Sequence, residues 1–208
     1  MRNLLIVGNG GHGKVVLDCA RQMGVYDKIA FLTDHEAEAL AGYPCFNEKE
    51  CDLGALRREY GELVVALGNN RLRLARQRYF AQLGFRLPVL VHPQAAVSPL
   101  AHIGAGSVVL AQAAVNAFAR VGEACILNTA AVVEHDCVLG DGVHLSPKAA
   151  IGGGTAVGEG TWLCVGVSAA DHIRIGAWSI AAAGAAVVRD VADGVVVAGV
   201  PAVVKKKL

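Results

Sequence analysis

A six-residue hydrophobic repeat runs through the second half of the chain, from Val91 to Val187. Stepping by six from Val91 meets seventeen positions, of which fifteen are Val, Ile or Leu and two are Ala. Four residues after each of them stands a small or β-branched residue, usually Ala, Ser, Cys, Thr or Val. One aliphatic residue per hexapeptide is typical of a parallel β-helix, in which each hexapeptide forms a short strand and a turn.

Glycine adds a longer period to this pattern. It directly follows the aliphatic residue at Gly104, Gly122, Gly140, Gly158 and Gly176, which are eighteen residues apart. Three hexapeptides therefore make one coil, and successive coils stack at the strand spacing of about 4.8 Å. We expect these glycines in turns, because glycine tolerates backbone angles that other residues resist. The spacing leaves the handedness of the coil open.

Residues 1–86 have a different pattern, in which short apolar strands alternate with helical segments. This alternation predicts a small Rossmann-like α/β domain with a parallel sheet. We therefore divide the chain into a domain of residues 1–86 and a β-helix domain of residues 87–208. The expected strands are 4–7, 29–32 and 63–67, and the expected helices are 14–23 and 71–83.

A glycine-rich loop follows the first expected strand. Gly8, Gly10 and Gly13 have the G-x-G-x-x-G spacing of dinucleotide-binding proteins, and Asp34 stands about twenty residues further on. This pattern alone would favour NAD. However, N–H groups at the start of a helix bind any pyrophosphate, and fewer than 90 residues is short for a two-halved dinucleotide fold. We therefore favour a nucleotide-sugar over NAD.

The ligand of this domain is expected at the carboxyl ends of its parallel strands, where such sheets collect ligands. For His12 the alternative is a helix-start histidine that contacts only solvent or backbone. The candidate substrate-binding residues are Gly10, Gly11, His12, Asp34 and Asn69.

The strongest catalytic candidate in the repeat is His135, between Glu134 and Asp136. An eighteen-residue step places Gly153 over it, which leaves a notch without side chains. Histidine has a suitable pKa for a general base near neutral pH, a neighbouring carboxylate can orient it, and the Gly153 N–H can stabilise an oxyanion. The spacing does not choose between Asp136 and Glu134, and the competing interpretation is a surface histidine.

The same step places Trp162 over His144. His144 is a candidate contact for an acyl donor, with a turn residue as the alternative, and Trp162 is expected to be a packing or interface residue. The other histidines of the repeat, His92, His102 and His172, are expected to have no catalytic role. No metal site is predicted, because the histidines lack further ligands at workable spacing.

Composition excludes several classes of function. The net charge of +1 implies no broad attraction to nucleic acid, and no apolar run reaches the ~18 residues of a membrane span. The six cysteines show no paired or metal-binding spacing, which favours reduced thiols and a cytoplasmic protein.

One segment, residues 87–119, contains no Asp, Glu, Lys or Arg. Such a bare surface predicts contact with another subunit. Packing against the N-terminal domain alone is the alternative.

Together the motifs resemble the sugar O-/N-acetyltransferases among the hexapeptide-repeat acyltransferases. That family includes sialic acid O-acetyltransferases and UDP-N-acetylbacillosamine N-acetyltransferases. The segments that carry the resemblance are 8–16, 67–70, 128–129, 134–136, 144–147 and 199–202.

The resemblance implies a left-handed β-helix, a homotrimer, acetyl-CoA in the groove between adjacent prisms, and a nucleotide-sugar held by the N-terminal domain. It makes His135 the general base, with Asp136 where many relatives have Glu. It also assigns Asn128, His144 and Gly153 to the acetyl-donor site. The basic tail 205–207 is either a contact for coenzyme A phosphates or a frayed terminus.

The expected function is therefore acetyl-CoA-dependent N-acetylation of a UDP-4-amino-sugar of the bacillosamine type, in bacterial glycan biosynthesis. The alternatives are O- or N-acetylation of another sugar, such as sialic acid or a GDP- or dTDP-amino sugar, and a non-catalytic nucleotide-binding protein.

Overall fold

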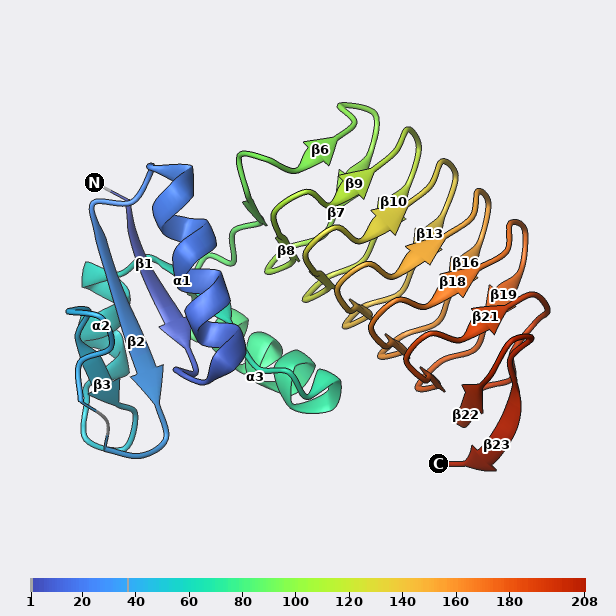
Figure 1. The fold of residues 1–208 in the computed structure, drawn as a ribbon. Helices are drawn as coiled ribbons and strands as arrows, with labels where there is room; N and C mark the ends of the chain where they lie inside the picture. The colour runs from blue at the N-terminus through green and yellow to red at the C-terminus, as the bar shows by residue number, and fades with distance from the viewer. Residues whose placement is uncertain (1, 37) are drawn as a thin grey trace.

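The computed structural model describes residues 2–36 and 38–208, which form a small α/β unit followed by a long three-faced prism (Figure 1). The sheet of the α/β unit is parallel and has the order β3-β2-β1-β4. Its strands are β1 (Asn3–Val7), β2 (Lys28–Thr33), β3 (Cys45–Asn47) and β4 (Glu62–Val65). The expected parallel sheet is thus present, and β3 is an addition that the sequence did not predict.

The helices of this unit are α1 (Gly11–Met23), α2 (Leu53–Glu59) and α3 (Asn70–Gln82). Two of them were expected. Helix α1 begins three residues before the predicted start, because the end of the glycine loop is already helical. Helix α3 begins after Asn69, whose side chain accepts a hydrogen bond from the Leu72 N–H at 3.0 Å and so caps the helix.

The six-residue repeat forms the prism, as predicted. Each hexapeptide contributes a two-residue strand, and the second residue of every strand is a position of the repeat that points into the core. The seventeen strands are β5 (Leu90–Val91), β6 (Ala96–Val97), β7 (His102–Ile103), β8 (Val108–Val109), β9 (Ala114–Val115), β10 (Arg120–Val121), β11 (Ile126–Leu127), β12 (Val132–Val133), β13 (Val138–Leu139), β14 (His144–Leu145), β15 (Ala150–Ile151), β16 (Ala156–Val157), β17 (Trp162–Leu163), β18 (Ser168–Ala169), β19 (Arg174–Ile175), β20 (Ile180–Ala181) and β21 (Ala186–Val187).

The strands form three parallel sheets, one on each face of the prism. Because neighbouring residues of a strand point to opposite sides, the first residue of each strand lies on the outer surface. We call the faces the docking face (β5, β8, β11, β14, β17, β20), the small-residue face (β6, β9, β12, β15, β18, β21) and the charged face (β7, β10, β13, β16, β19). The outer residues of the small-residue face are only Ala, Val and Ser, whereas the charged face carries Arg120 and Arg174.

The glycines spaced by eighteen are needed for a different reason from the one expected. None of them has a left-handed backbone, but a Cβ on Gly104 would lie 2.5 Å from the Gly122 carbonyl carbon, and one on Gly140 would lie 2.6 Å from the Glu159 nitrogen. These positions are glycine because successive coils approach too closely for a side chain. The left-handed turn position lies two residues later, at Gly106 and Ala124 for example.

The N-terminal unit packs against the first strands of the docking face. Side chains of α1, such as Val16, share a buried cluster with Leu90, Val108 and Ile126. This contact covers part of the uncharged segment 87–119. Leu100, in the same segment, remains 59% exposed, so packing against the N-terminal unit alone does not account for the whole bare surface.

Helix α3 fixes the two units together along one corner of the prism. Asn70 donates to the Gly160 carbonyl at 3.0 Å, and Gln77 donates to the Ala105 carbonyl at 2.9 Å. Between them Arg73, which is 1% exposed, donates to the Ala124 carbonyl at 2.7 Å and the Gly142 carbonyl at 2.9 Å. The helix therefore contacts four consecutive coils.

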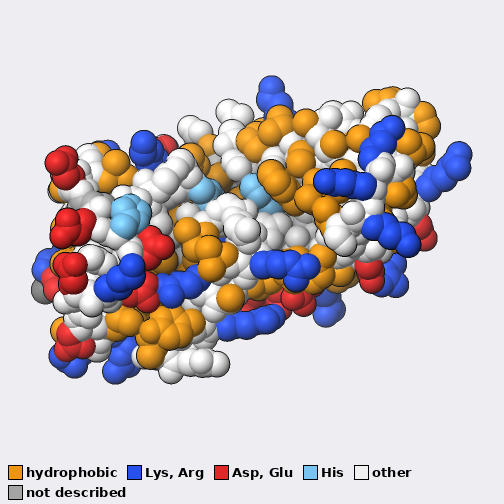
Figure 2. Space-filling model, turned by 90° about the horizontal axis from the view of Figure 1, so that it is seen from below, with side chains coloured by type: hydrophobic (Ala, Val, Ile, Leu, Met, Phe, Trp, Pro, Cys, Tyr) orange, Lys and Arg blue, Asp and Glu red, His pale blue; other side chains and the backbone are white. Residues whose placement is uncertain are grey.

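A hairpin closes the far end of the prism. Strand β22 (Val195–Ala198) extends the docking face, and β23 (Val203–Lys207) pairs with it in the antiparallel sense. The lysines 205–207 belong to β23, so the basic tail is a paired strand and not a frayed end. Figure 2 shows acidic side chains mostly toward the N-terminal end and basic side chains along the whole length of the molecule.

None of the helices in the described residues is long and apolar enough to span a lipid bilayer.

Candidate functional site

The glycine loop before α1 leaves open space where a ligand can approach. The fold itself requires Gly8, which has a left-handed φ of +97°, and Gly13, where a Cβ would lie 3.0 Å from the Gly8 carbonyl carbon. In contrast, a Cβ on Gly10 or Gly11 would meet nothing within 4 Å. Two of the four glycines are therefore unexplained by packing, which points to close approach of a ligand to the N-terminus of α1.

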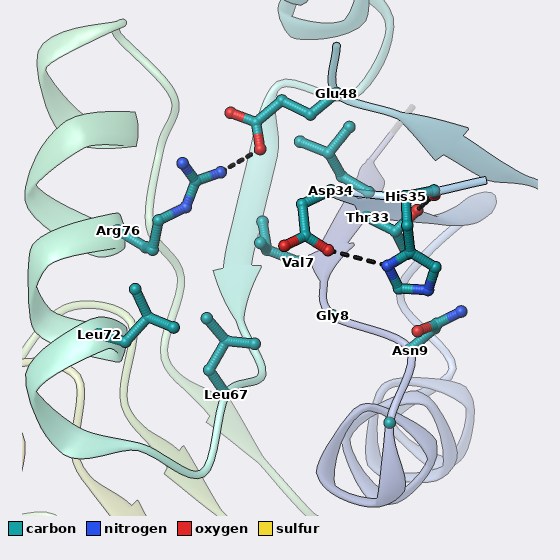
Figure 3. A pocket seen from close by; sticks show the side chains of 12 residues that line it. Val7, Gly8, Asn9, Thr33, Asp34, His35, Glu48, Leu67, Leu72 and Arg76 are labelled. Atoms are coloured by element: carbon teal, nitrogen blue, oxygen red, sulfur yellow. Dashed lines mark hydrogen bonds and ion pairs between the residues drawn. The ribbon is translucent and has the colours of Figure 1, made fainter. Parts of the chain in front are cut away.

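Next to this loop lies a cavity of about 330 Å³ at the carboxyl ends of β1 and β2 (Figure 3). Its floor is the end of the sheet, and α3 forms one wall. It is lined by Val7, Gly8, Asn9, Gly10, Leu32, Thr33, Asp34, His35, Glu48, Leu67, Leu72 and Arg76. The expected edge of the sheet thus carries a cavity of the size that holds small ligands.

Two pairs of ionisable side chains line this cavity. Asp34 Oδ1 lies 2.8 Å from His35 Nδ1, and this hydrogen bond lowers the pKa of Asp34. Arg76, from α3, forms an ion pair with Glu48. Glu48 and Arg76 were missed by the sequence reasoning, because Glu48 follows the unexpected strand β3 and Arg76 carries no motif.

Three of the predicted substrate-binding residues do not line the cavity. Gly11 and His12 belong to the first turn of α1, beside it, and the Asn69 side-chain oxygen is engaged in capping α3. His12 is partly buried, and burial together with the charge of Arg73 lowers its pKa to about 4. Its Nε2 has no hydrogen-bond partner among the described residues, so a neutral ring nitrogen is available there.

Two of the three predicted donor-site residues, Asn128 and His144, lie together at the docking face, whereas Gly153 lies beside His135. The His144 ring stacks on Trp162 with centroids 5.8 Å apart and an interplanar angle of 7°. The Trp162 indole N–H donates to the Ser146 hydroxyl at 2.8 Å, which fixes the stack. Trp162, assigned to packing from the sequence, therefore packs against a predicted site residue.

Burial and the nearby Arg73 cation keep His144 neutral. Burial lowers the pKa of His144 to about 3, and the charge of Arg73 contributes further. The side-chain nitrogen of Asn128 lies 3.5 Å from His144 Nε2. His144, Asn128 and His12 therefore form a polar group at the junction of the two units.

His135 lies elsewhere, at the corner between the small-residue face and the charged face. Its Nδ1 is 2.8 Å from Asp136 Oδ2, and both side chains are more than half exposed. Asp136 reaches the ring because its backbone is left-handed, with φ of 60°. This hydrogen bond raises the pKa of His135. The Glu134 carboxylate instead accepts from the His135 backbone N–H at 3.3 Å, so the ring contact belongs to Asp136.

The notch above His135 is present as expected. A Cβ on Gly153 would lie 2.6 Å from both Nε2 and Cε1 of His135, so any side chain at position 153 would displace the imidazole. The free Nε2 thus faces Gly153, while Nδ1 faces Asp136. Among the described residues the Gly153 N–H has no backbone acceptor.

The two groups of candidate residues do not meet within one chain. His144 and the cavity lie on the side of the docking face, whereas His135 stands at the opposite corner, between the other two faces. The arrangement brings His135, Asp136 and Gly153 together, and separately brings His12, Asn128 and His144 together. Residues 2–36 and 38–208 contain no group of three or more side chains suited to a metal ion.

Comparison with known proteins identifies relatives over the full length of the chain. Residues 3–80 match the PglD N-terminal domain family. The acetyltransferase domain of PglB from Neisseria gonorrhoeae FA1090, solved with acetyl coenzyme A, is 42% identical with a TM-score of 0.91, covering 100% of this chain and 99% of that one.

A histidine-to-asparagine variant of perosamine N-acetyltransferase from Caulobacter crescentus, solved with CoA and GDP-perosamine, is 39% identical with a TM-score of 0.93, covering 100% and 98%. UDP-N-acetylbacillosamine N-acetyltransferase of Bacillus subtilis (strain 168) is 40% identical over 120 residues. This match covers 53% of the chain and about half, 52%, of that curated relative.

These matches confirm the architecture of an α/β domain followed by a left-handed β-helix. The fold and the family resemblance expected from the motifs agree with them. The chain belongs to the family of sugar N-acetyltransferases that use acetyl-CoA.

Proposed function

We propose that this protein transfers the acetyl group of acetyl-CoA to the amine of a nucleotide-linked amino sugar. The observation that carries the proposal is the His135–Asp136 pair with its free Nε2 facing Gly153. The amine attacks the thioester carbonyl while His135 Nε2 takes its proton. Asp136 holds Nδ1–H and stabilises the imidazolium, and the Gly153 N–H is the donor nearest to the developing oxyanion.

The nucleotide-sugar is assigned to the cavity beside the glycine loop. Its diphosphate would lie at the N-terminus of α1, beside Gly10 and Gly11. The exposed Asp34 carboxylate is an acceptor for a base N–H or a sugar hydroxyl. We assign the nucleotide-binding role to residues 1–86 and the transfer chemistry to residues 87–208.

For the acceptor we propose a UDP-4-amino-sugar of the bacillosamine type, used in bacterial glycan biosynthesis. The Bacillus subtilis relative supports this choice. The Caulobacter crescentus relative was solved with GDP-perosamine and matches the whole chain, so a GDP-linked 4-amino sugar is the second candidate. The six free cysteines fit the proposed cytoplasmic location.

A homotrimer completes the site in this proposal. Within one chain His135 is on the opposite side of the prism from the cavity and His144, so a second copy must supply one half. The small-residue face supports such a contact, because its outer positions carry no charge and allow close approach, whereas the charged face carries two arginines.

Acetyl-CoA is assigned to the groove between adjacent prisms of the proposed trimer, on the side of the docking face. Asn128 and His144 lie at the acetyl end, and Trp162 continues the same outer row toward the C-terminal hairpin. The exposed lysines of β23 lie at the far end, where they can pair with the phosphates of the coenzyme.

An acceptor screen with acetyl-CoA tests the function. Release of free thiol is followed with UDP-, dTDP- and GDP-linked amino sugars, and we expect turnover with UDP-4-amino sugars. His135→Asn should lower kcat by about 10²- to 10⁴-fold, as loss of a general base does. His102→Asn, on the charged face, is the matched control and should keep wild-type turnover. Near-wild-type transfer by the His135 variant would remove the catalytic assignment.

A further inference from the structure

A second imidazole leans over the recess that His135 faces. The corner that follows His135 by one coil is Gly152–Gly154, and its glycines leave the surface bare. A Cβ on Gly153 would lie 2.6 Å from the His135 ring, whereas one on Gly154 would lie 2.7 Å from Cε1 of His172. Two adjacent residues are thus covered by two histidines, one from the coil before and one from the coil after.

Backbone hydrogen bonds fix this arrangement. The Gly154 N–H donates to the His135 carbonyl at 2.8 Å, and the His172 N–H donates to the Gly153 carbonyl at 2.8 Å. Both histidines are therefore held at the same three-coil corner. The ring nitrogens nearest to these adjacent glycines are His135 Nε2, at Gly153, and His172 Nδ1, at Gly154.

The fold gives no reason for histidine at position 172. The residue has a left-handed φ of 53°, a conformation that glycine adopts most easily. Its side chain is exposed, and within residues 2–36 and 38–208 its ring makes no hydrogen bond. A titratable ring aimed into a recess, without a packing or hydrogen-bonding role, is available for a ligand.

We propose that His172 is the second acid–base residue of the reaction centre and protonates the departing thiolate of coenzyme A. The proposal rests on the acetyl-transfer function above. The new C–N bond forms as the amine proton passes to His135 Nε2. The C–S bond then breaks, its electron pair stays on sulfur, and the sulfur takes the proton of His172. The products are the amide and the free thiol, and both exposed imidazoles exchange protons with water.

With two histidines, one accepts the amine proton and the other protonates the thiolate. A single histidine would have to perform both steps one after the other. His135 must be neutral to accept a proton, and Asp136 favours its protonated form once it has done so. Among the described residues no carboxylate is hydrogen-bonded to the His172 ring, so it is free to donate. Since a thiolate is already a good leaving group, we expect the contribution of His172 to be about tenfold, below the usual range for general acids.

The charged neighbours of His172 are few. Asp171 precedes it, Arg189 and Asp190 occupy the next corner, and the Asp190 carboxylate accepts a hydrogen bond from the Arg174 N–H at 2.8 Å. On the other side, beyond the glycines, are Glu134 and the His135–Asp136 pair.

The first test is the pH dependence of kcat. Because the reaction needs His135 without its proton and His172 with one, the wild-type profile should have both a rising and a descending limb. His172→Gln keeps a polar N–H but cannot titrate, so it should lose the descending limb and about tenfold in kcat at neutral pH, with KM for the amino sugar unchanged. His102→Gln should keep both limbs. A His172→Gln profile that superimposes on the wild-type profile would overturn the proposal while leaving the transferase function intact.

The second test does not require a known acceptor. The imidazole C–H signals of His172 are assigned by comparing the nuclear magnetic resonance spectra of wild type and His172→Gln, and the protein is titrated with CoA. We expect the His172 signals to shift and those of His102 to stay in place. Unshifted His172 signals at saturating CoA would refute the thiol contact. A shift combined with a failed acceptor screen would instead keep the donor site and reject the proposed acceptor.

Discussion

At the scale of single residues, the decisive feature is the left-handed backbone of Asp136. In a regular strand, neighbouring side chains point to opposite sides, and the carboxylate of Asp136 would turn away from His135. The turn conformation instead brings the Asp136 oxygen to 2.8 Å from His135 Nδ1. The orientation of the proposed base thus depends on backbone geometry as much as on residue type.

Replacing Asp136 with Asn should change the pH dependence of transfer. The hydrogen bond to Asp136 raises the pKa of His135, and only the neutral ring can accept a proton. In Asp136→Asn that pKa falls, so the rising limb of kcat moves to lower pH, while lost orientation lowers the plateau by about tenfold or more. Steady-state rates across pH check this, with Asp18→Asn on α1 as the control. An unchanged rising limb would contradict the role of Asp136.

Single residues also show why the site was only partly predictable. The sequence was enough to predict that Gly153 lies over His135, because the eighteen-residue period of the repeat places residues i and i+18 above one another on adjacent coils. Glu48 was not found, since it reaches the cavity through β3, whose pairing with β2 is set by tertiary packing. His172 was set aside because its importance depends on the direction in which its ring leans, and periodicity does not specify this.

At the scale of elements, the prism was more predictable than the α/β unit. All seventeen strands follow the six-residue repeat, because the same inward position recurs in every coil. In the α/β unit, the start of α1 was placed too late and α2 was missed, since a seven-residue helix offers too short a pattern.

Substitutions at the glycines spaced by eighteen residues test how tightly the coils are stacked. In Gly140→Ala the new methyl group would meet the backbone of the next coil at 2.6 Å, so we expect unfolding to become easier by about 1–3 kcal/mol, as in overpacked cores. Urea denaturation measures this. Gly61→Ala, where the nearest atom is 4.0 Å away, should leave the free energy of unfolding within about 0.5 kcal/mol of wild type. Equal effects of the two changes would argue against close coil contact.

At the scale of the whole molecule, the junction of the two units depends on one buried cation. Arg73 donates to three carbonyl groups, those of Leu67, Ala124 and Gly142, and no carboxylate of the described residues pairs with it. Arg73→Met would leave these acceptors without a donor, so we expect a loss of about 3 kcal/mol or more in the free energy of unfolding. Arg78→Met, an exposed change on the same helix, should cost about 0.5 kcal/mol or less. A stable Arg73→Met protein in urea denaturation would contradict this role.

The proposed trimer predicts that a new charge has different effects on the small-residue face and on the charged face. Ala150→Arg places a long cation on the small-residue face and should shift the particle from trimer to monomer, with loss of transfer because the site needs two copies. Val138→Arg, on the charged face, should keep both the trimer and the activity. Light scattering after size-exclusion chromatography measures the mass. A trimeric Ala150→Arg protein would exclude this face from the contact.

Helix α3 also limits how the length of the prism can vary. From Asn70 to Gln77 the helix rises about 10 Å, while the corners that it contacts, from Ala105 to Gly160, span three coil steps, or about 14 Å. The side chains of Asn70, Arg73 and Gln77 bridge this mismatch because they are flexible. Each turn of the helix can therefore contact a different coil, although the helix rises less than the prism over the same stretch. An eighteen-residue insertion between those corners would break the match, whereas one after Val187 would lengthen the prism without moving the sugar-binding unit relative to His135.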